Sequence, residues 1–245
     1  MIISRAWLSP VLAFLLALAP HVASAGSAPV HRRVVVDLSQ PPWRAVGRVQ
    51  TELGARCTGF LLAPRLVVTA AHCLYRRSTG RFVQPSSVHF LWRYAAGAYA
   101  DHARVVSFVV EPGYDPAAED RSLGVDRVFL TLDHAVGPAG DMAGLSHVSP
   151  RPGVPLLLGG YNRDRAEVAE ADPDCRLIGF GVDAGGHRLL LHDCLGLQGT
   201  SGAPLFARQP DGHWAVVGLE VAIIGPGGRT GIAEPLDAEA MGTGR

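Results

Sequence analysis

Short apolar runs separated by glycine and proline fill this chain, and they restrict it to folds built mainly from β-strands. The sequence has 245 residues, of which 29 are Gly and 18 are Pro, spread along its length. Between them lie apolar runs such as 59–62, 66–69, 128–132 and 215–221, a pattern typical of strands joined by tight turns. About ten such runs predict an all-β sandwich or barrel, with a short C-terminal helix at 236–241.

The composition indicates a folded chain without a general affinity for nucleic acid. Hydrophobic residues make up 48% of the sequence and charged residues 18%, while the formal net charge is zero. This hydrophobic content supports a buried core. A nucleic-acid-binding protein usually carries a basic excess, so we expect no nucleic-acid partner.

Residues 1–25 have the organisation of a signal peptide. Arg5 supplies the positive charge, residues 11–19 an apolar run, and Ala23-Ser24-Ala25 a small-x-small cleavage site. An uncleaved membrane anchor is the alternative, although the apolar run is short for a membrane span. We therefore expect a secreted protein, extracellular or periplasmic, with no membrane contact after cleavage of the signal.

The four cysteines predict disulfides, since export places them in an oxidising compartment. Four cysteines allow three pairings, and the sequence alone does not choose among them. Pairing of neighbours, Cys57–Cys73 and Cys175–Cys194, closes the shortest loops and is adopted as our expectation. No Cys-x-x-Cys motif is present, so we expect no metal.

Two sequence patterns place a histidine and a carboxylate at strand ends. His72 follows the apolar run 66–69 and small residues, directly before Cys73, and Asp126 precedes the apolar run 128–132. Taken alone, such a histidine is more often structural than catalytic. Likewise, such an aspartate more often binds turn amides.

A third pattern places Ser201 between glycines. Gly199-Thr200-Ser201-Gly202 precedes another apolar run. Gly199 permits an unusual backbone conformation, which would let the amides of Gly199 and Ser201 form an oxyanion hole. Ser and Gly are also ordinary turn residues, so the motif by itself is weak.

Taken together, the three patterns resemble chymotrypsin-like serine proteases. Thr-Ala-Ala-His-Cys at 69–73 is similar to their histidine motif, 199–204 to their serine motif, and Asp126 with Val-Phe-Leu-x-Leu to their aspartate motif. The order His, Asp, Ser is that of this family. Cys-Thr-Gly-Phe-Leu at 57–61, Leu-His-Asp-Cys at 191–194 and Gly-Tyr-Asp at 113–115 resemble the bacterial glutamyl endopeptidase-like branch.

The resemblance implies a fold and a reaction. It implies two packed six-stranded antiparallel β-barrels within a protease domain at 26–245, with lobes at about 34–126 and 127–235. His72 would be the general base, Asp126 the carboxylate that orients it, and Ser201 the nucleophile of a secreted endopeptidase. Polypeptides would be the substrates, no cofactor is needed, and we expect a monomer. The alternatives are a catalytically inactive binding module of the same fold and an unrelated secreted β-sandwich.

Activation departs from the pattern of the animal digestive members. Thr200 stands where those relatives carry an Asp that pairs with a newly formed N-terminus. Residues 26–33 form a possible short propeptide, released by cleavage after Arg32-Arg33. A solvent-facing arginine pair is the alternative.

The substrate pocket is expected from alignment to the serine motif. Leu195 should lie near its base, and Val221, Ala222 and Ile223 along its edge. Glutamate-selective relatives carry a histidine where Glu220 stands, and a carboxylate would repel a glutamate side chain. We therefore predict no strong preference for cleavage after Glu. Glu220 would either favour basic or polar residues or face solvent at the rim.

Overall fold

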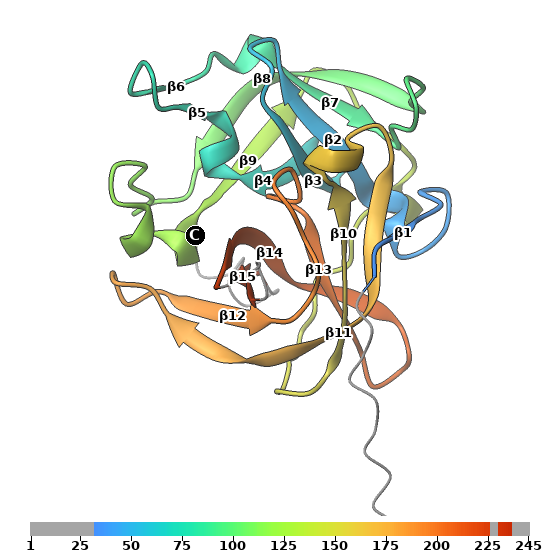
Figure 1. Ribbon diagram of the computed structural model, residues 1–245. Helices are drawn as coiled ribbons and strands as arrows, with labels where there is room; N and C mark the ends of the chain where they lie inside the picture. Colours follow the sequence, from blue (N-terminus) through green and yellow to red (C-terminus); the bar gives the residue numbers. More distant parts are fainter. Residues whose placement is uncertain (1–31, 226–229, 237–245) are drawn as a thin grey trace, which may run out of the picture.

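The computed structural model describes residues 32–225 and 230–236 (Figure 1). The expected signal peptide and residues 237–241 of the expected terminal helix lie outside these residues. No helix in the described part of the chain is long and apolar enough to cross a membrane.

The described elements are short strands and single turns of 3₁₀-helix. The strands are β1 (Val34–Val35), β2 (Val46–Thr51), β3 (Arg56–Ala63), β4 (Leu66–Ala70), β5 (Tyr75–Arg76), β6 (Arg81–Phe82), β7 (Val88–Trp92), β8 (Asp101–Val110), β9 (Arg127–Leu132), β10 (Pro155–Tyr161), β11 (Ala169–Val182), β12 (Arg188–His192), β13 (Pro204–Arg208), β14 (Trp214–Ile224) and β15 (Thr230–Pro235). The 3₁₀ turns are η1 (Trp43–Ala45), η2 (Ala71–Leu74), η3 (Pro85–Ser87), η4 (Glu119–Arg121), η5 (Leu123–Val125), η6 (Ala139–Asp141) and η7 (Arg163–Arg165).

The strands form two antiparallel barrels, as the sequence predicts. β2, β3, β4, β9, β8 and β7 close the first barrel, in the upper half of Figure 1. The second runs β11-β10-β13-β14-β15-β12 and closes through pairing of β11 with β12. Because β9 is a strand of the first barrel, the chain passes to the second barrel after Leu132 and not at residue 126.

β1 belongs to the second barrel, although it precedes the first in sequence. Val34 and Val35 pair with β11. Arg33, directly before them, binds Asp164 at 2.9 Å and the buried Glu170 at 3.1 Å. The Arg33 side chain thus tethers the N-terminal segment to the second barrel, and cleavage after Arg33 would remove this tether.

Each barrel encloses side chains that alternate inward along its strands. Phe60, Val68 and Leu130 are fully buried in the first barrel, and Leu156 and Leu205 in the second. The short apolar runs of the sequence are therefore the strands whose inward faces build these cores.

A buried ion pair joins the barrels beside Asp126. Arg127 of β9 donates from Nη1 to Glu234 of β15, and from Nε to Glu111 at 2.9 Å. Glu234 is fully buried, and its Oε2 has no partner. Burial raises the pKa of the Glu234 carboxyl well above its ordinary value, although the charge of Arg127 opposes the shift.

Candidate active site

A buried carboxylate holds His72 where the two barrels meet. β4 ends at Ala70, and η2 then carries His72, while Asp126 stands directly before β9, the partner strand of β4. Asp126 Oδ2 lies 2.6 Å from His72 Nδ1, and Asp126 Oδ1 accepts the His72 amide at 2.9 Å. Asp126 is only 2% exposed. The strand pairing thus brings together two residues that are 54 positions apart in the sequence. The family resemblance predicts these two residues as partners.

The environment of His72 favours its protonated form. Burial lowers the pKa of the imidazole, but the negative charge of Asp126 and the hydrogen bond to it outweigh burial, so the pKa of His72 is raised above 6.5. The same hydrogen bond places a proton on Nδ1 when the ring is neutral. Nε2 is then free to accept a proton from another group.

Ser201 lies on the same cavity as His72. This cavity, of about 510 Å³, is lined by both barrels, with Cys57 and His72 from the first and Tyr161, Gly199 and Ser201 from the second. Among the described residues, Ser201 Oγ forms no hydrogen bond, to His72 or to any other group. Catalytic hydrogen bonds of this kind often form only when substrate is bound.

The backbone before Ser201 presents two amides without acceptors. Gly199 has φ +103°, the left-handed region that the sequence motif predicts for it. Within residues 32–225 and 230–236, neither the Gly199 amide nor the Ser201 amide donates a hydrogen bond. Two adjacent unpaired N–H groups beside a cavity are able to stabilise an oxyanion.

Thr58 of β3 fixes this backbone from the opposite barrel. Its Oγ1 donates to the Gly199 carbonyl at 3.0 Å and accepts the Tyr161 amide at 2.9 Å. Its own amide donates to the Ser201 carbonyl at 2.9 Å. No sequence pattern predicts this role for Thr58, whose only signal is its place beside Cys57.

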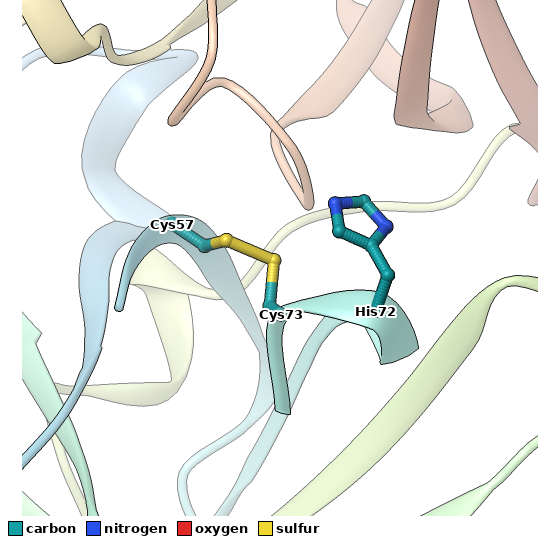
Figure 2. Close-up of side chains that lie close together, drawn as sticks. All are labelled: Cys57, His72 and Cys73. Atoms are coloured by element: carbon teal, nitrogen blue, oxygen red, sulfur yellow. A yellow bond between two sulfur atoms is a disulfide. The ribbon is translucent and has the colours of Figure 1, made fainter. Parts of the chain in front are cut away.

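The structure contains the disulfides Cys57–Cys73 and Cys175–Cys194. Figure 2 shows the first of them beside the His72 ring. Potential ligand atoms of Cys57, His72 and Cys73 lie within 4.8 Å of one another. Because both sulfur atoms are used in the disulfide, this group offers no thiolate to a metal. The disulfide instead links β3 to the turn that carries His72.

A second cavity, of about 210 Å³, adjoins the first at Ser201. Its walls are Leu197, Gln198, Ser201, Glu220, Ala222 and Ile223. Glu220, Ala222 and Ile223 thus lie where the alignment places them. Leu195 and Val221 do not line the cavity. The Leu195 amide binds Asp172, and Val221, at an irregularity in the pairing of β14 with β15, packs in the hydrophobic core.

Glu220 is buried and does not face solvent at the rim. It is 1% exposed, and its Oε2 lies 2.7 Å from Nε2 of the fully buried His192. The sequence motifs do not predict His192 as its partner. The pairing of both β14 and β12 with β15 brings the two residues together.

Comparison with known proteins identifies the family. A family model described as trypsin matches residues 31–168, more than half of the chain. The chain belongs to the trypsin family.

The relatives of this trypsin-family chain include glutamyl endopeptidases. It is 35% identical over 57 residues to a glutamyl endopeptidase from Bacillus licheniformis, a match covering 23% of this chain and 18% of that protein. It is also similar to a solved Glu endopeptidase in complex with MPD, with a TM-score of 0.70 and 17% identity over 86% of this chain and 93% of that one. This structural likeness confirms the trypsin-family fold.

Proposed function

We propose that this protein is a secreted serine endopeptidase that cleaves peptide bonds through an acyl-enzyme intermediate. The observation that carries the proposal is the buried Asp126–His72 pair on a cavity that also contains Ser201. Because the chain belongs to the trypsin family, we assign hydrolysis of peptide bonds to this arrangement.

In the proposed mechanism, Ser201 Oγ attacks the peptide carbonyl while His72 Nε2 accepts the hydroxyl proton. Asp126 keeps the other ring proton on Nδ1 and stabilises the imidazolium that forms. His72 then donates its proton to the leaving amine. Water, activated by the same imidazole, hydrolyses the acyl-enzyme and regenerates Ser201.

The charge that develops on the carbonyl oxygen needs donors that are already in place. The unpaired amides of Gly199 and Ser201 would supply them, and Thr58 holds the backbone that follows each amide through its bonds to the Gly199 and Ser201 carbonyls. Removing one such donor in comparable enzymes costs about 10²- to 10³-fold in rate.

Export is part of the proposal. The signal-peptide pattern of residues 1–25 and the two disulfides support folding in an oxidising compartment. Edman sequencing of protein recovered from the medium or periplasm tests the export step.

Labelling with a fluorophosphonate probe tests the proposed nucleophile. We expect covalent labelling of the wild-type protein and none of Ser201→Ala, with Ser149→Ala, a change at an exposed serine, labelled like wild type. His72→Ala should remain folded and hydrolyse peptides at least 10³-fold more slowly. Absence of labelling in the folded wild-type protein would contradict the proposal and favour the inactive binding module.

A further inference from the structure

Two arginines stand opposite each other on the hairpin of β5 and β6, which lies at the upper left of Figure 1. Arg76 and Arg81 are direct cross-strand neighbours in this hairpin, and both are exposed. Residues paired in this way have Cβ atoms about 5 Å apart on one face of the ribbon, and like charges so placed repel each other. An anion shared by the two guanidinium groups would relieve this repulsion.

No carboxylate in the described part of the chain pairs with either guanidinium group. The Arg76 side chain donates only to Ser78 Oγ, at 3.0 Å. Two acidic side chains from adjoining loops are engaged elsewhere, because Glu119 accepts a hydrogen bond from Arg77 at 2.6 Å and Glu52 lies 3.4 Å from a β7 histidine. The two facing positive charges are therefore left for a partner from outside the described residues.

Both arginines line a third cavity, of about 440 Å³. Its other walls are Leu53, Thr79, Phe82, Val83 and Gln84. Because none of these side chains is acidic, the third cavity combines two positive charges with apolar surface. Such a surface is complementary to a negatively charged ligand that also carries carbon groups.

The hairpin that carries these charges is fixed on both sides. On its inner side, the Phe82 ring packs against Tyr75 at 5.3 Å and against Phe108 of β8 at 6.1 Å, measured between ring centroids. At its tip, the amides of residues 79 and 80 donate to the Arg76 carbonyl at 3.1 and 2.9 Å. The wall of the third cavity is therefore formed before any ligand binds.

The third cavity adjoins the cavity that contains His72 and Ser201. Leu53 lines the third cavity and Gly54 the first, and Arg76 lines the third and Tyr75 the first. The second cavity meets the first at Ser201. A polypeptide that passes through the first cavity, leading away from the second, therefore reaches the two arginines.

We propose that Arg76 and Arg81 bind an acidic segment of the polypeptide substrate, several residues away from the cleaved bond. This inference rests on the proposed peptidase function. A Glu or Asp carboxylate of the bound segment accepts hydrogen bonds from the guanidinium groups, while Leu53 and Phe82 contact its carbon groups. The residue next to the cleaved bond does not reach this site, so the third cavity selects among substrates independently of the second.

A peptide scan tests the proposal. The parent is a peptide that the enzyme cleaves at one bond flanked by glutamines, and each Gln is replaced in turn by Glu, which has nearly the same shape. We expect kcat/KM to rise about 3- to 10-fold at one or two positions, on one side of the bond and away from it. The gain should fall below about twofold in about 0.5 M NaCl, because salt screens exposed charges. Mass spectrometry verifies that the cleaved bond stays the same.

Substitutions assign the effect to the hairpin. In the double variant Arg76→Gln/Arg81→Gln, the Glu-to-Gln ratio of kcat/KM at the preferred position should fall below about twofold. Arg208→Gln is the matched control, because Arg208 is exposed and lines a different cavity, and it should keep the wild-type ratio. Circular dichroism checks that each variant is folded. Should the double variant not fold, the scan and its salt dependence in the wild-type enzyme decide.

Two outcomes would overturn the inference: a wild-type scan in which Glu gives no gain at any position, or a gain that persists in the folded double variant. Fluorophosphonate labelling is run in parallel. A labelled enzyme that cleaves the parent peptide without any gain from Glu refutes this inference alone. An unlabelled protein that cleaves none of the peptides refutes the proposed peptidase function. Fluorescence anisotropy then decides on the third cavity, since equal binding of the all-Glu and all-Gln peptides would refute a site for acidic segments.

Discussion

Replacing Arg127 by Met should destabilise the protein more than any change to an exposed ion pair. The substitution keeps an unbranched apolar stem but leaves Glu234 fully buried without its cation. Breaking a buried pair in this way costs about 3–5 kcal/mol. The contact of Arg127 with the partly exposed Glu111 adds at most about 1 kcal/mol. For a domain of this size, a loss of about 3 kcal/mol lowers Tm by about 6–12 °C.

The stability of the Arg127→Met variant should also depend on pH in a defined direction. Without Arg127, the already raised pKa of Glu234 rises further, so the folded state binds a proton that the unfolded state releases near its ordinary value of 4.5. A raised folded-state pKa contributes stability at low pH that is lost as the pH rises through that pKa. The penalty of the substitution should therefore be larger at pH 8 than at pH 5.

Thermal and urea unfolding, followed by circular dichroism at both pH values, measure this penalty. Arg77→Met is the matched control, because Arg77 and its partner Glu119 form an ion pair in which the Arg77 side chain is 76% exposed, and it should cost under about 1 kcal/mol. The double variant Arg127→Met/Glu234→Leu should recover most of the lost stability. A cost for Arg127→Met as small as that of the control, or one that grows as the pH falls, would refute the reasoning.

Three further predictions follow from the geometry. The pKa of His72 is raised above 6.5, and His72 must be neutral to act as a base. In a pH–rate profile, kcat/KM should therefore fall at acidic pH with a midpoint above 6.5, and in Asp126→Asn this midpoint should shift below 6.5. Gly202→Ala should lower the free energy of urea unfolding by about 3 kcal/mol or more, because residue 202 has φ +81° and an added Cβ would lie 2.2 Å from a β3 carbonyl oxygen. Gly54→Ala is the control: residue 54 has φ +91° but open space around an added Cβ, so the loss should be only about 1 kcal/mol. N-terminal sequencing of mature protein should give a start before Arg33, because its side chain binds the second barrel; a start at Val34 would contradict this.

The fold and the His72–Asp126 pair were predictable because the motifs that carry the family resemblance are local. Alternating apolar residues fix strands, and the small residues beside His72 and the apolar run after Asp126 mark two strand ends that the barrel brings together. Each signal lies within a few residues of the group that it predicts.

Other features depend on which strands become neighbours, and no local pattern encodes that. The Arg127–Glu234 pair joins residues of different barrels. The contact between Glu220 and His192 depends on the pairing of both β14 and β12 with β15. Leu195 does not line the second cavity, and its place in the substrate pocket stays a prediction. Alignment to a motif counts residues, but the direction of each side chain in the irregular segment before Ser201 is set by individual hydrogen bonds, such as that from the Leu195 amide to Asp172.

The three hydrogen bonds that Thr58 makes to the second barrel limit how the barrels are able to move. A residue of the first barrel clamps the carbonyls of Gly199 and Ser201 and the amide of Tyr161 in the second. Hinge opening between the barrels would break all of these contacts at once and release the backbone that carries the unpaired amides of Gly199 and Ser201. A molecule that occupies the cavity between the barrels must therefore fit it without such an opening, or break these contacts as it binds.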